Sequence, residues 1–293
     1  MTKGSAIAQC EYCGVQQTVP LLDDEKKAAL FQRANRLLAE CDFEKASVVY
    51  ESIVADYPRE PEAYWGLLLC EYGIEYVDDP KSGKKHPTCH RASYQSFLAE
   101  GDYQRVLEYA SPEAAEVYRR EAEHIESIRK EMIAIASRED HYDIFISYKE
   151  KEDSGERTVD SVLAQELYKE LTAEGYRVFF SRITLEKKLG VQYEPYIFAA
   201  LQSAKVMLVV GTEPEHFQSV WVKNEWNRFL RMMSDDRSKH LIPCYKNMSP
   251  TEMPREFAVL QGQDLGKIGA VQDILWGIQK LIPRQESPVA DEQ

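Results

Sequence analysis

The sequence predicts a helical first half followed by an α/β domain built on a parallel sheet. Between residues 23 and 138, apolar residues recur at helical spacing and strand-like runs are few. From residue 139 onward, short β-branched and aromatic runs alternate with amphipathic stretches, as in strands connected by helices. Because these short runs are apolar at nearly every position, we expect helices to cover both faces of the sheet.

Length and composition fit a folded protein of about two domains. The 293 residues include 36 Lys and Arg against 49 Asp and Glu, which gives a formal net charge of −13. A chain this acidic lacks the basic face that binds a phosphate backbone, so we expect no nucleic-acid partner. No run approaches about 18 consecutive apolar residues, so we expect no membrane span. The polar N-terminus does not look like a secretory signal, and the six scattered cysteines fit reduced thiols; both features predict a cytoplasmic protein.

Residues 1–22 are expected to form an irregular tail that carries one CxxC knuckle, Cys10-Glu11-Tyr12-Cys13-Gly14. This knuckle resembles part of a zinc ribbon, which normally has two such pairs around its metal. His86, Cys89 and His90 would complete a site only if the two segments met, and nothing in the sequence indicates that they do. We therefore predict no metal site, with Cys10 and Cys13 as the candidates for one, and no required cofactor.

Residues 23–138 contain a helical hairpin, Leu30–Cys41 followed by Phe43–Tyr57, and a third helix that begins at Pro61. This region resembles a tetratricopeptide repeat in the turn Asp42-Phe43-Glu44-Lys45-Ala46, in Tyr50, in Pro58 and in the pair Ala63-Tyr64. The resemblance covers little more than one unit of about 34 residues, whereas repeat arrays normally need about three. We expect the region to bind a protein partner or a trigger.

Two further features belong to the helical half. Residues 74–92 include the polar run Asp78-Asp79-Pro80-Lys81-Ser82-Gly83-Lys84-Lys85-His86-Pro87, and we expect them to form a long exposed loop. Cys41 and Cys70 lie within the expected helices, where we expect them to be core thiols.

The second half is expected to extend from residue 139 to residue 283, with residues 284–293 as a disordered tail. The expected strands are Tyr142–Tyr148, Tyr176–Phe180, Lys205–Val210 and His240–Tyr245, and the expected helices are Val162–Leu171, Pro195–Ser203, Val220–Met233 and Val271–Leu281. Open parallel sheets bind ligands at the carboxyl ends of their strands. The loops after Tyr148, Phe180 and Val210 are therefore the expected surroundings of a site.

Glu194 is the foremost candidate at this edge of the sheet. It directly precedes Pro195, a residue typical of a first helical turn, where the helix dipole favours an ionised carboxylate. Gly190 permits a sharp turn in the preceding loop. The alternative is that Glu194 only caps its helix. The sequence contains no GxGxxG after a strand, no GxxxxGK[ST], no HExxH and no GxSxG, which argues against the common dinucleotide, P-loop, zinc-protease and hydrolase sites.

About half of the chain, from Tyr142 to Leu281, resembles a TIR (Toll/interleukin-1 receptor) domain. The resemblance rests on Asp143–Tyr148 (DIFISY), on the segment from Val178 to Gly190 and on Ser219–Trp226 (SVWVKNEW). It implies a flavodoxin-like α/β fold. The spacing from the loop glycine to Glu194 is similar to that of TIR domains that cleave NAD⁺, in which a glutamate of this helix is catalytic. Many TIR domains carry Asp directly after the second strand, whereas this chain has Ser181-Arg182.

By this resemblance we expect an NAD⁺ glycohydrolase or ADP-ribosyl cyclase in which Glu194 stabilises an oxocarbenium-like transition state. The expected substrate-binding residues are Phe145, Ser147, Tyr148, Lys149, Phe180, Ser181, Arg182, Gly190, Tyr193 and Trp221. Tyr148, Phe180, Tyr193 or Trp221 would line the rings of NAD⁺. Lys149 and Arg182 would face the pyrophosphate. The alternative for each of these four aromatic residues, and for Trp226, is core packing, and it is the favoured one. The alternative for the two cations is that they are solvated loop charges.

The resemblance also implies self-association through residues 182–189, where we expect Ile183, Leu185 and Leu189 to be exposed. It implies a role in bacterial immune signalling, such as defence against phage. Two other functions remain open: a non-catalytic TIR scaffold that signals by association, and a helical-repeat adaptor with a passive α/β half. Glu194 favours the enzyme over the scaffold, and the partial repeat argues against the adaptor.

Overall fold

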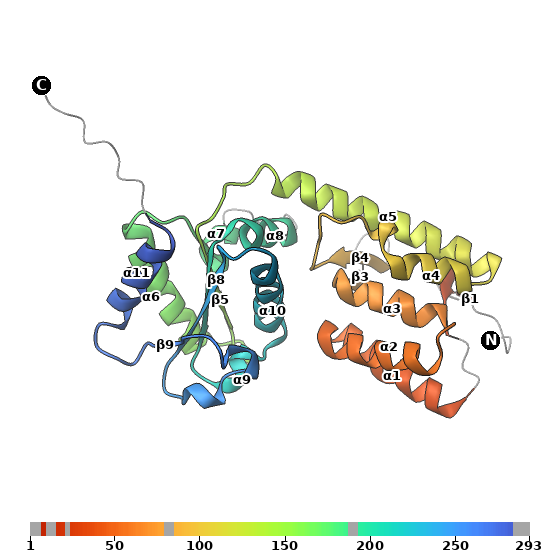
Figure 1. Cartoon of the computed structure of the whole chain (residues 1–293), viewed down its shortest axis with the longest axis horizontal. Coiled ribbons are helices and arrows are strands. Elements are labelled where there is room, and N and C mark those ends of the chain that lie inside the picture. The colour runs from red at the N-terminus through yellow and green to blue at the C-terminus, as the bar shows by residue number, and fades with distance from the viewer. Residues whose placement is uncertain (1–6, 10–15, 21–23, 79–84, 187–192, 284–293) are drawn as a thin grey trace, which may run out of the picture. The chain divides into compact units, whose positions relative to one another are not determined.

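The computed structural model describes residues 7–9, 16–20, 24–78, 85–186 and 193–283 (Figure 1). The chain divides into two compact units, Met1–Arg138 and Glu139–Gln293. Among the described residues, no helix is both long enough and apolar enough to cross a membrane.

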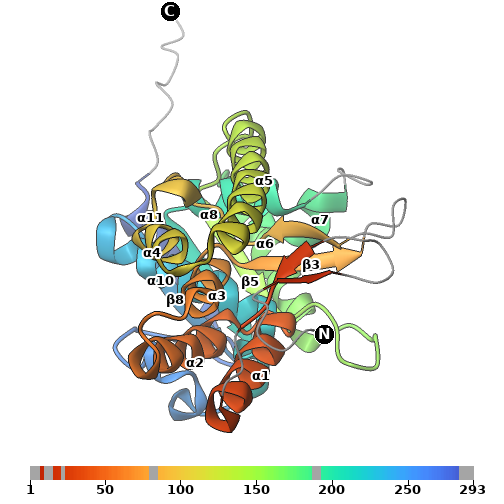
Figure 2. The ribbon, with the colours of Figure 1, turned by 90° about the vertical axis from the view of Figure 1, so that its right-hand side faces the viewer.

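The first unit is built on helices α1 (Glu25–Ala39), α2 (Phe43–Asp56) and α3 (Pro61–Glu71). Asp24 and Asp42 cap the first two of these helices, because each side chain accepts a hydrogen bond from a backbone N–H of the first turn. Both views show these helices on one side of the unit, with α4 (Gly101–Tyr109) and α5 (Pro112–Ala136) beyond α3 (Figures 1 and 2). The predicted helical first half is confirmed.

Residues 74–92 do not form the long exposed loop expected from the sequence. Ile74–Asp78 (β3) and Lys85–Cys89 (β4) pair as an antiparallel ribbon in which Ile74 lies opposite Cys89. Ile74 and Cys89 are both buried, which stabilises this end of the ribbon. The strand β3 was not predicted because its short run of β-branched and aromatic residues lies next to a polar tract that contains Pro and Gly.

The N-terminal segment also contains a ribbon where an irregular tail was expected. Ile7–Gln9 (β1) and Gln16–Thr18 (β2) pair antiparallel, with Ile7 opposite Thr18. Cys10 and Cys13 lie outside the described residues, so the expectation that they bind no metal stays a prediction.

The second unit contains a five-stranded parallel sheet with the order β6-β5-β7-β8-β9. Its strands are Ile144–Tyr148 (β5), Val178–Phe180 (β6), Val206–Gly211 (β7), His240–Tyr245 (β8) and Gln263–Asp264 (β9). The first four are the strands expected from the sequence: β8 has the expected ends, and the ends of the other three differ by at most two residues. The two-residue strand β9 was not predicted.

Helices cover both faces of this sheet (Figure 1). On one face, α6 (Val159–Ala173) and α11 (Ala270–Leu281) pack against alternate residues of β5, including Ile144 and Ile146. On the other face, α8 (Glu194–Ser203) and α10 (Val220–Asp235) pack against Phe145. The predicted α/β architecture is therefore confirmed.

The segment after β6 is partly helical rather than a continuous loop. Ser181–Glu186 form the short helix α7, and Ile183, expected to be exposed, is partly buried against the core. Gly190 and Leu189 lie outside the described residues, as does the side chain of Leu185.

Candidate active site

Glu194 is the first residue of α8, at the carboxyl edge of the sheet. The helix ends at Ser203, and β7 begins at Val206 only a few residues later. Because parallel strands all begin at the amino edge, α8 must begin at the opposite edge, where open sheets bind ligands. The Glu194 side chain is partly buried, and the next residue, Pro195, is buried in the first turn.

Two aromatic side chains at this edge are about half exposed. Tyr193, directly before Glu194, is 47% exposed, and Trp221, at the start of α10, is 46% exposed. The favoured expectation of a buried Trp221 was therefore wrong, whereas Trp226 is buried and donates a hydrogen bond from Nε1 to the carbonyl oxygen of Phe217 over 2.8 Å. Helical spacing predicts that Trp221 and Trp226 belong to one helix, but it does not determine how deeply the first turn of that helix is buried.

Phe145 and Phe180 both pack in the interior, which is the alternative role considered for Phe180. The ring of Phe145 stacks on Phe179, with 4.9 Å between centroids, and the ring of Phe180 stacks on Tyr148 at 5.1 Å. Burial raises the pKa of the Tyr148 hydroxyl above its ordinary value. That hydroxyl lies 3.3 Å from Ser181 Oγ, so the structure brings two of the expected site residues together where β5 and β6 end.

The two expected cations have partners within the protein. Lys149 Nζ lies 2.8 Å from Glu152 Oε2, and this contact raises the pKa of the Lys149 amine. Arg182 is exposed and donates a hydrogen bond to Gln165 Oε1 over 2.9 Å. An anionic ligand at Lys149 would therefore compete with a surface carboxylate.

Glu225 contacts the expected site residue Ser147, a pairing that was not expected from the sequence. Ser147, near the end of β5, donates a hydrogen bond of 2.5 Å from Oγ to Glu225 Oε2 on α10. Burial raises the pKa of the Glu225 carboxyl to about 7, although the hydrogen bond from Ser147 acts in the opposite direction. The available signal was an acidic residue three positions after Val222 and four before Phe229, both of which lie on the buried face of α10.

A second polar cluster that the sequence reasoning missed joins the segments after β5 and β7. Asp160 Oδ1 accepts hydrogen bonds from the backbone N–H and the hydroxyl of Thr212, over 2.8 and 2.7 Å. Asp160 Oδ2 lies 2.8 Å from His216 Nδ1, and His216 Nε2 lies 3.3 Å from Glu152 Oε1. Burial raises the pKa of the Asp160 carboxyl, while its polar contacts oppose that change. The cluster fixes the relative positions of two segments at the carboxyl edge.

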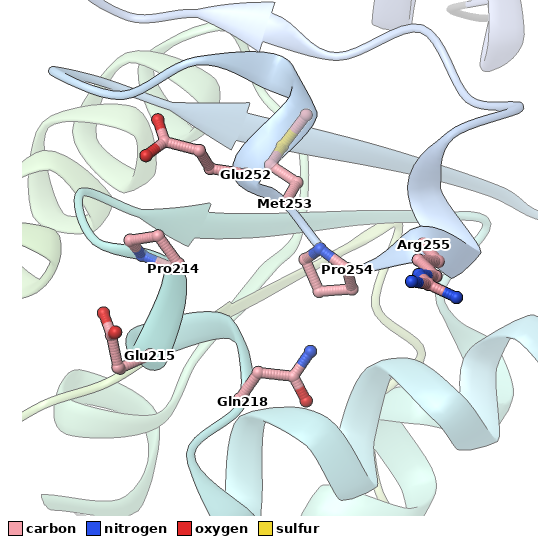
Figure 3. A pocket seen from close by; sticks show the side chains of 7 residues that line it. All are labelled: Pro214, Glu215, Gln218, Glu252, Met253, Pro254 and Arg255. Atoms are coloured by element: carbon pink, nitrogen blue, oxygen red, sulfur yellow. The ribbon is translucent and has the colours of Figure 1, made fainter.

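A surface hollow of about 480 Å³ lies beyond β7 and β8 (Figure 3). It is lined by Pro214, Glu215, Gln218, Glu252, Met253, Pro254 and Arg255. Pro214, Glu215 and Gln218 belong to the segment around α9 (Pro214–Phe217), and the others to the region of two 3₁₀ turns after β8. These lining residues do not include Glu194, so the hollow is separate from the expected catalytic residue.

Comparison with known protein families matches residues 144–274 to the family described as TIR domain. The matched segment begins at β5, includes all five strands of the sheet and reaches into α11. A search of the curated proteins finds no match to the chain. The resemblance of the second half to a TIR domain is thus confirmed over the matched residues. The tetratricopeptide and zinc-ribbon resemblances of the first half stay predictions.

Proposed function

We propose that this chain, whose residues 144–274 form a TIR domain, cleaves the nicotinamide–ribose bond of NAD⁺ with Glu194 as the catalytic carboxylate. The observation that carries the proposal is the position of Glu194 at the start of α8, on the ligand-binding edge of a parallel sheet. The products are nicotinamide and ADP-ribose, or a cyclic isomer of ADP-ribose.

The proposed chemistry requires one carboxylate and no metal ion. The bonding electrons of the C1′–N bond leave with the cationic nicotinamide, which departs as a neutral molecule without a general acid. Positive charge develops on the ribose, and Glu194 stabilises it at short range. In hydrolysis, water then adds to C1′ and loses a proton, so that NAD⁺ and water give ADP-ribose, nicotinamide and H⁺.

The exposed fraction of each aromatic side chain indicates which of them can contact the rings of NAD⁺. Tyr193 and Trp221 retain accessible surface at the edge where Glu194 lies, whereas Phe145 and Phe180 are covered by the core. We assign Tyr193 and Trp221 to the nicotinamide or adenine ring, and we assign Phe145 and Phe180 to the support of the strands.

Self-association and a signalling role form part of the same proposal. TIR domains commonly self-associate, and we assign this contact to the segment 182–189. Control by a partner of the helical unit, in bacterial immune signalling, accounts for the presence of two units in one chain.

The test is mass analysis of the products formed when the purified full chain is incubated with NAD⁺, beside the variants Glu194→Gln and Glu215→Gln. Glu215 is an exposed glutamate in the first turn of α9 and serves as the matched control. We expect Glu194→Gln to lower nicotinamide release by about a thousandfold, the scale of losing a central electrostatic group, and Glu215→Gln to leave it unchanged. If a folded Glu194→Gln protein releases nicotinamide at the wild-type rate, the assignment of Glu194 is contradicted. No release by the wild-type chain at any concentration favours the non-catalytic scaffold.

A further inference from the structure

The first unit brings together a thiol, a carboxylate and an imidazole from three separate segments. Cys41 Sγ and one potential ligand atom each from Glu75 and His90 all lie within 4.8 Å of one another. From the sequence, we expect Cys41 to be a core thiol, and His90 is a candidate ligand only together with the N-terminal knuckle. Neither expectation brought these three residues together.

The fold holds each of the three residues in place. Cys41 occupies the turn between α1 and α2 with a left-handed backbone, φ 56°, and is only 4% exposed. Glu75 lies on β3, and His90 follows the last residue of β4. The backbone N–H of His90 donates to the carbonyl oxygen of Gly73 over 2.9 Å, which ties the segment after β4 to the start of β3.

The polar atoms of this cluster point toward one another. His90 Nε2 lies 2.8 Å from Glu75 Oε2 and 3.2 Å from Thr88 Oγ1. The Thr88 hydroxyl donates its proton to the carbonyl oxygen of Glu75 over 3.1 Å. A sulfur, an imidazole nitrogen and a carboxylate oxygen therefore lie within reach of one another, and a cation bound by all three would take the place of the proton between His90 Nε2 and Glu75 Oε2.

The charge of the cluster also suits a divalent ion. One thiolate and one carboxylate neutralise Zn²⁺, while the imidazole binds in its neutral form. Neutrality matters because the side chains of Cys41 and His90 are almost completely removed from water. The neighbouring cation, Arg91, pairs with Glu44 at 2.5 Å, so that this contact is itself neutral.

We infer that Cys41, Glu75 and His90 form a Zn²⁺ site of the helical unit, with a water molecule as the fourth ligand. Sulfur, imidazole and carboxylate ligands are those of tetrahedral zinc sites, whereas Mg²⁺ and Ca²⁺ are bound by oxygen ligands. A bound ion would link the α1–α2 turn to the β3–β4 ribbon. The site is independent of the proposed NAD⁺ chemistry.

The experiment uses the full chain with the knuckle removed, Cys10→Ser/Cys13→Ser, because the knuckle is itself a candidate zinc ligand. Co²⁺ is added to this parent protein, and absorption is recorded, since cobalt bound to a thiolate gives a charge-transfer band and tetrahedral cobalt gives visible d–d bands. Zn²⁺ affinity is then measured by displacement of the cobalt. The variants Cys41→Ser, His90→Asn and Glu75→Gln are compared with Cys70→Ser, which removes another buried thiol of the same unit.

We expect the parent and Cys70→Ser to show the charge-transfer band and to bind one Zn²⁺. We expect Cys41→Ser to lose the band, and Cys41→Ser and His90→Asn each to weaken Zn²⁺ binding by more than about 100-fold. A parent protein without the band overturns the inference, as does a band or an affinity that Cys41→Ser or His90→Asn leaves unchanged. Circular dichroism establishes that each variant is folded. Glu75→Gln is a separate test of the carboxylate ligand. Loss of this ligand should shift the d–d bands of bound cobalt, and unchanged bands would contradict its assignment.

Discussion

The hydroxyl of Ser147, near the end of β5, and the carboxylate of Glu225 on α10 are joined by a hydrogen bond of 2.5 Å. This contact connects two of the segments that carry the resemblance to TIR domains, and it places an ionisable group between the sheet and the helix that begins with Trp221. The consequences are measurable in the pH dependence of stability.

Glu225→Gln should change how stability depends on pH. The folded-state pKa of Glu225, about 7, is higher than its ordinary value of 4.5, so its contribution is fully present below pH 4.5 and is lost as the pH rises through about 7. Glutamine does not titrate. The free energy of unfolding of Glu225→Gln, relative to wild type, should therefore rise by up to about 2 kcal/mol between pH 4.5 and 8, which allows for screening of the partly exposed side chain. Urea unfolding at a series of pH values measures this difference, and parallel curves for the two proteins contradict it.

Asp160→Ala should strongly destabilise the second unit. Asp160 is fully buried, and its replacement leaves the Thr212 N–H and the Thr212 hydroxyl without their acceptor and removes the partner of His216 Nδ1. We expect a loss of about 3 kcal/mol in the free energy of unfolding. The control is Glu213→Ala, whose exposed carboxylate lies 3.7 Å from His216 Nε2 and should contribute less than about 0.5 kcal/mol. Equal losses in the two variants would show that the buried cluster has no special weight.

Alanine should have opposite effects at two helical glycines. A Cβ on Gly66 of α3 would lie 2.4 Å from the ring of Tyr50, whose hydroxyl is held by Asn35 over 2.6 Å. Gly66→Ala should therefore cost about 2 kcal/mol through overpacking. A Cβ on Gly277 of α11 meets no described atom within 4 Å, so Gly277→Ala should gain up to about 1 kcal/mol from helix propensity. Thermal unfolding measures both variants, and stabilisation by Gly66→Ala contradicts the packing argument.

NAD⁺ cleavage should increase more than proportionally with protein concentration. If the segment 182–189 forms the contact between copies of the TIR domain, Leu185→Asp should suppress activity without unfolding the protein, since it places a charge in that contact. The control is Val48→Asp, at a residue of α2 that is 62% exposed. Constant specific activity from nanomolar to high micromolar protein, in a sample shown to be monomeric throughout, contradicts self-association.

The strands of the sheet could be predicted because each is a nearly continuous apolar run. Val206–Gly211, for example, is buried at every position and offers no helical periodicity. The strand Gln263–Asp264 escaped prediction because two polar residues carry no pattern, and their pairing depends on the position of β8. The strand β3, Ile74–Asp78, was not predicted because only its pairing with β4 distinguishes it from the polar tract beside it.

The candidate site likewise has a part that could be predicted from the sequence and a part that could not. The position of Glu194 followed from local signals, a proline in a first turn and the alternation of strands and helices. The pairs Ser147–Glu225 and Asp160–His216 did not, because each joins segments more than fifty residues apart in the chain. Their partners are decided by the order of the strands, which no local pattern contains.

The two outer strands of the sheet are its shortest ones. The strand at one edge, β6, has three residues, and the strand at the other edge, β9, has two. Such short edges offer few unpaired backbone groups to an added strand, so they disfavour growth of the sheet from one molecule into the next. Copies of this domain would then assemble through helices and connecting segments, and each sheet would keep its own five strands in the assembly.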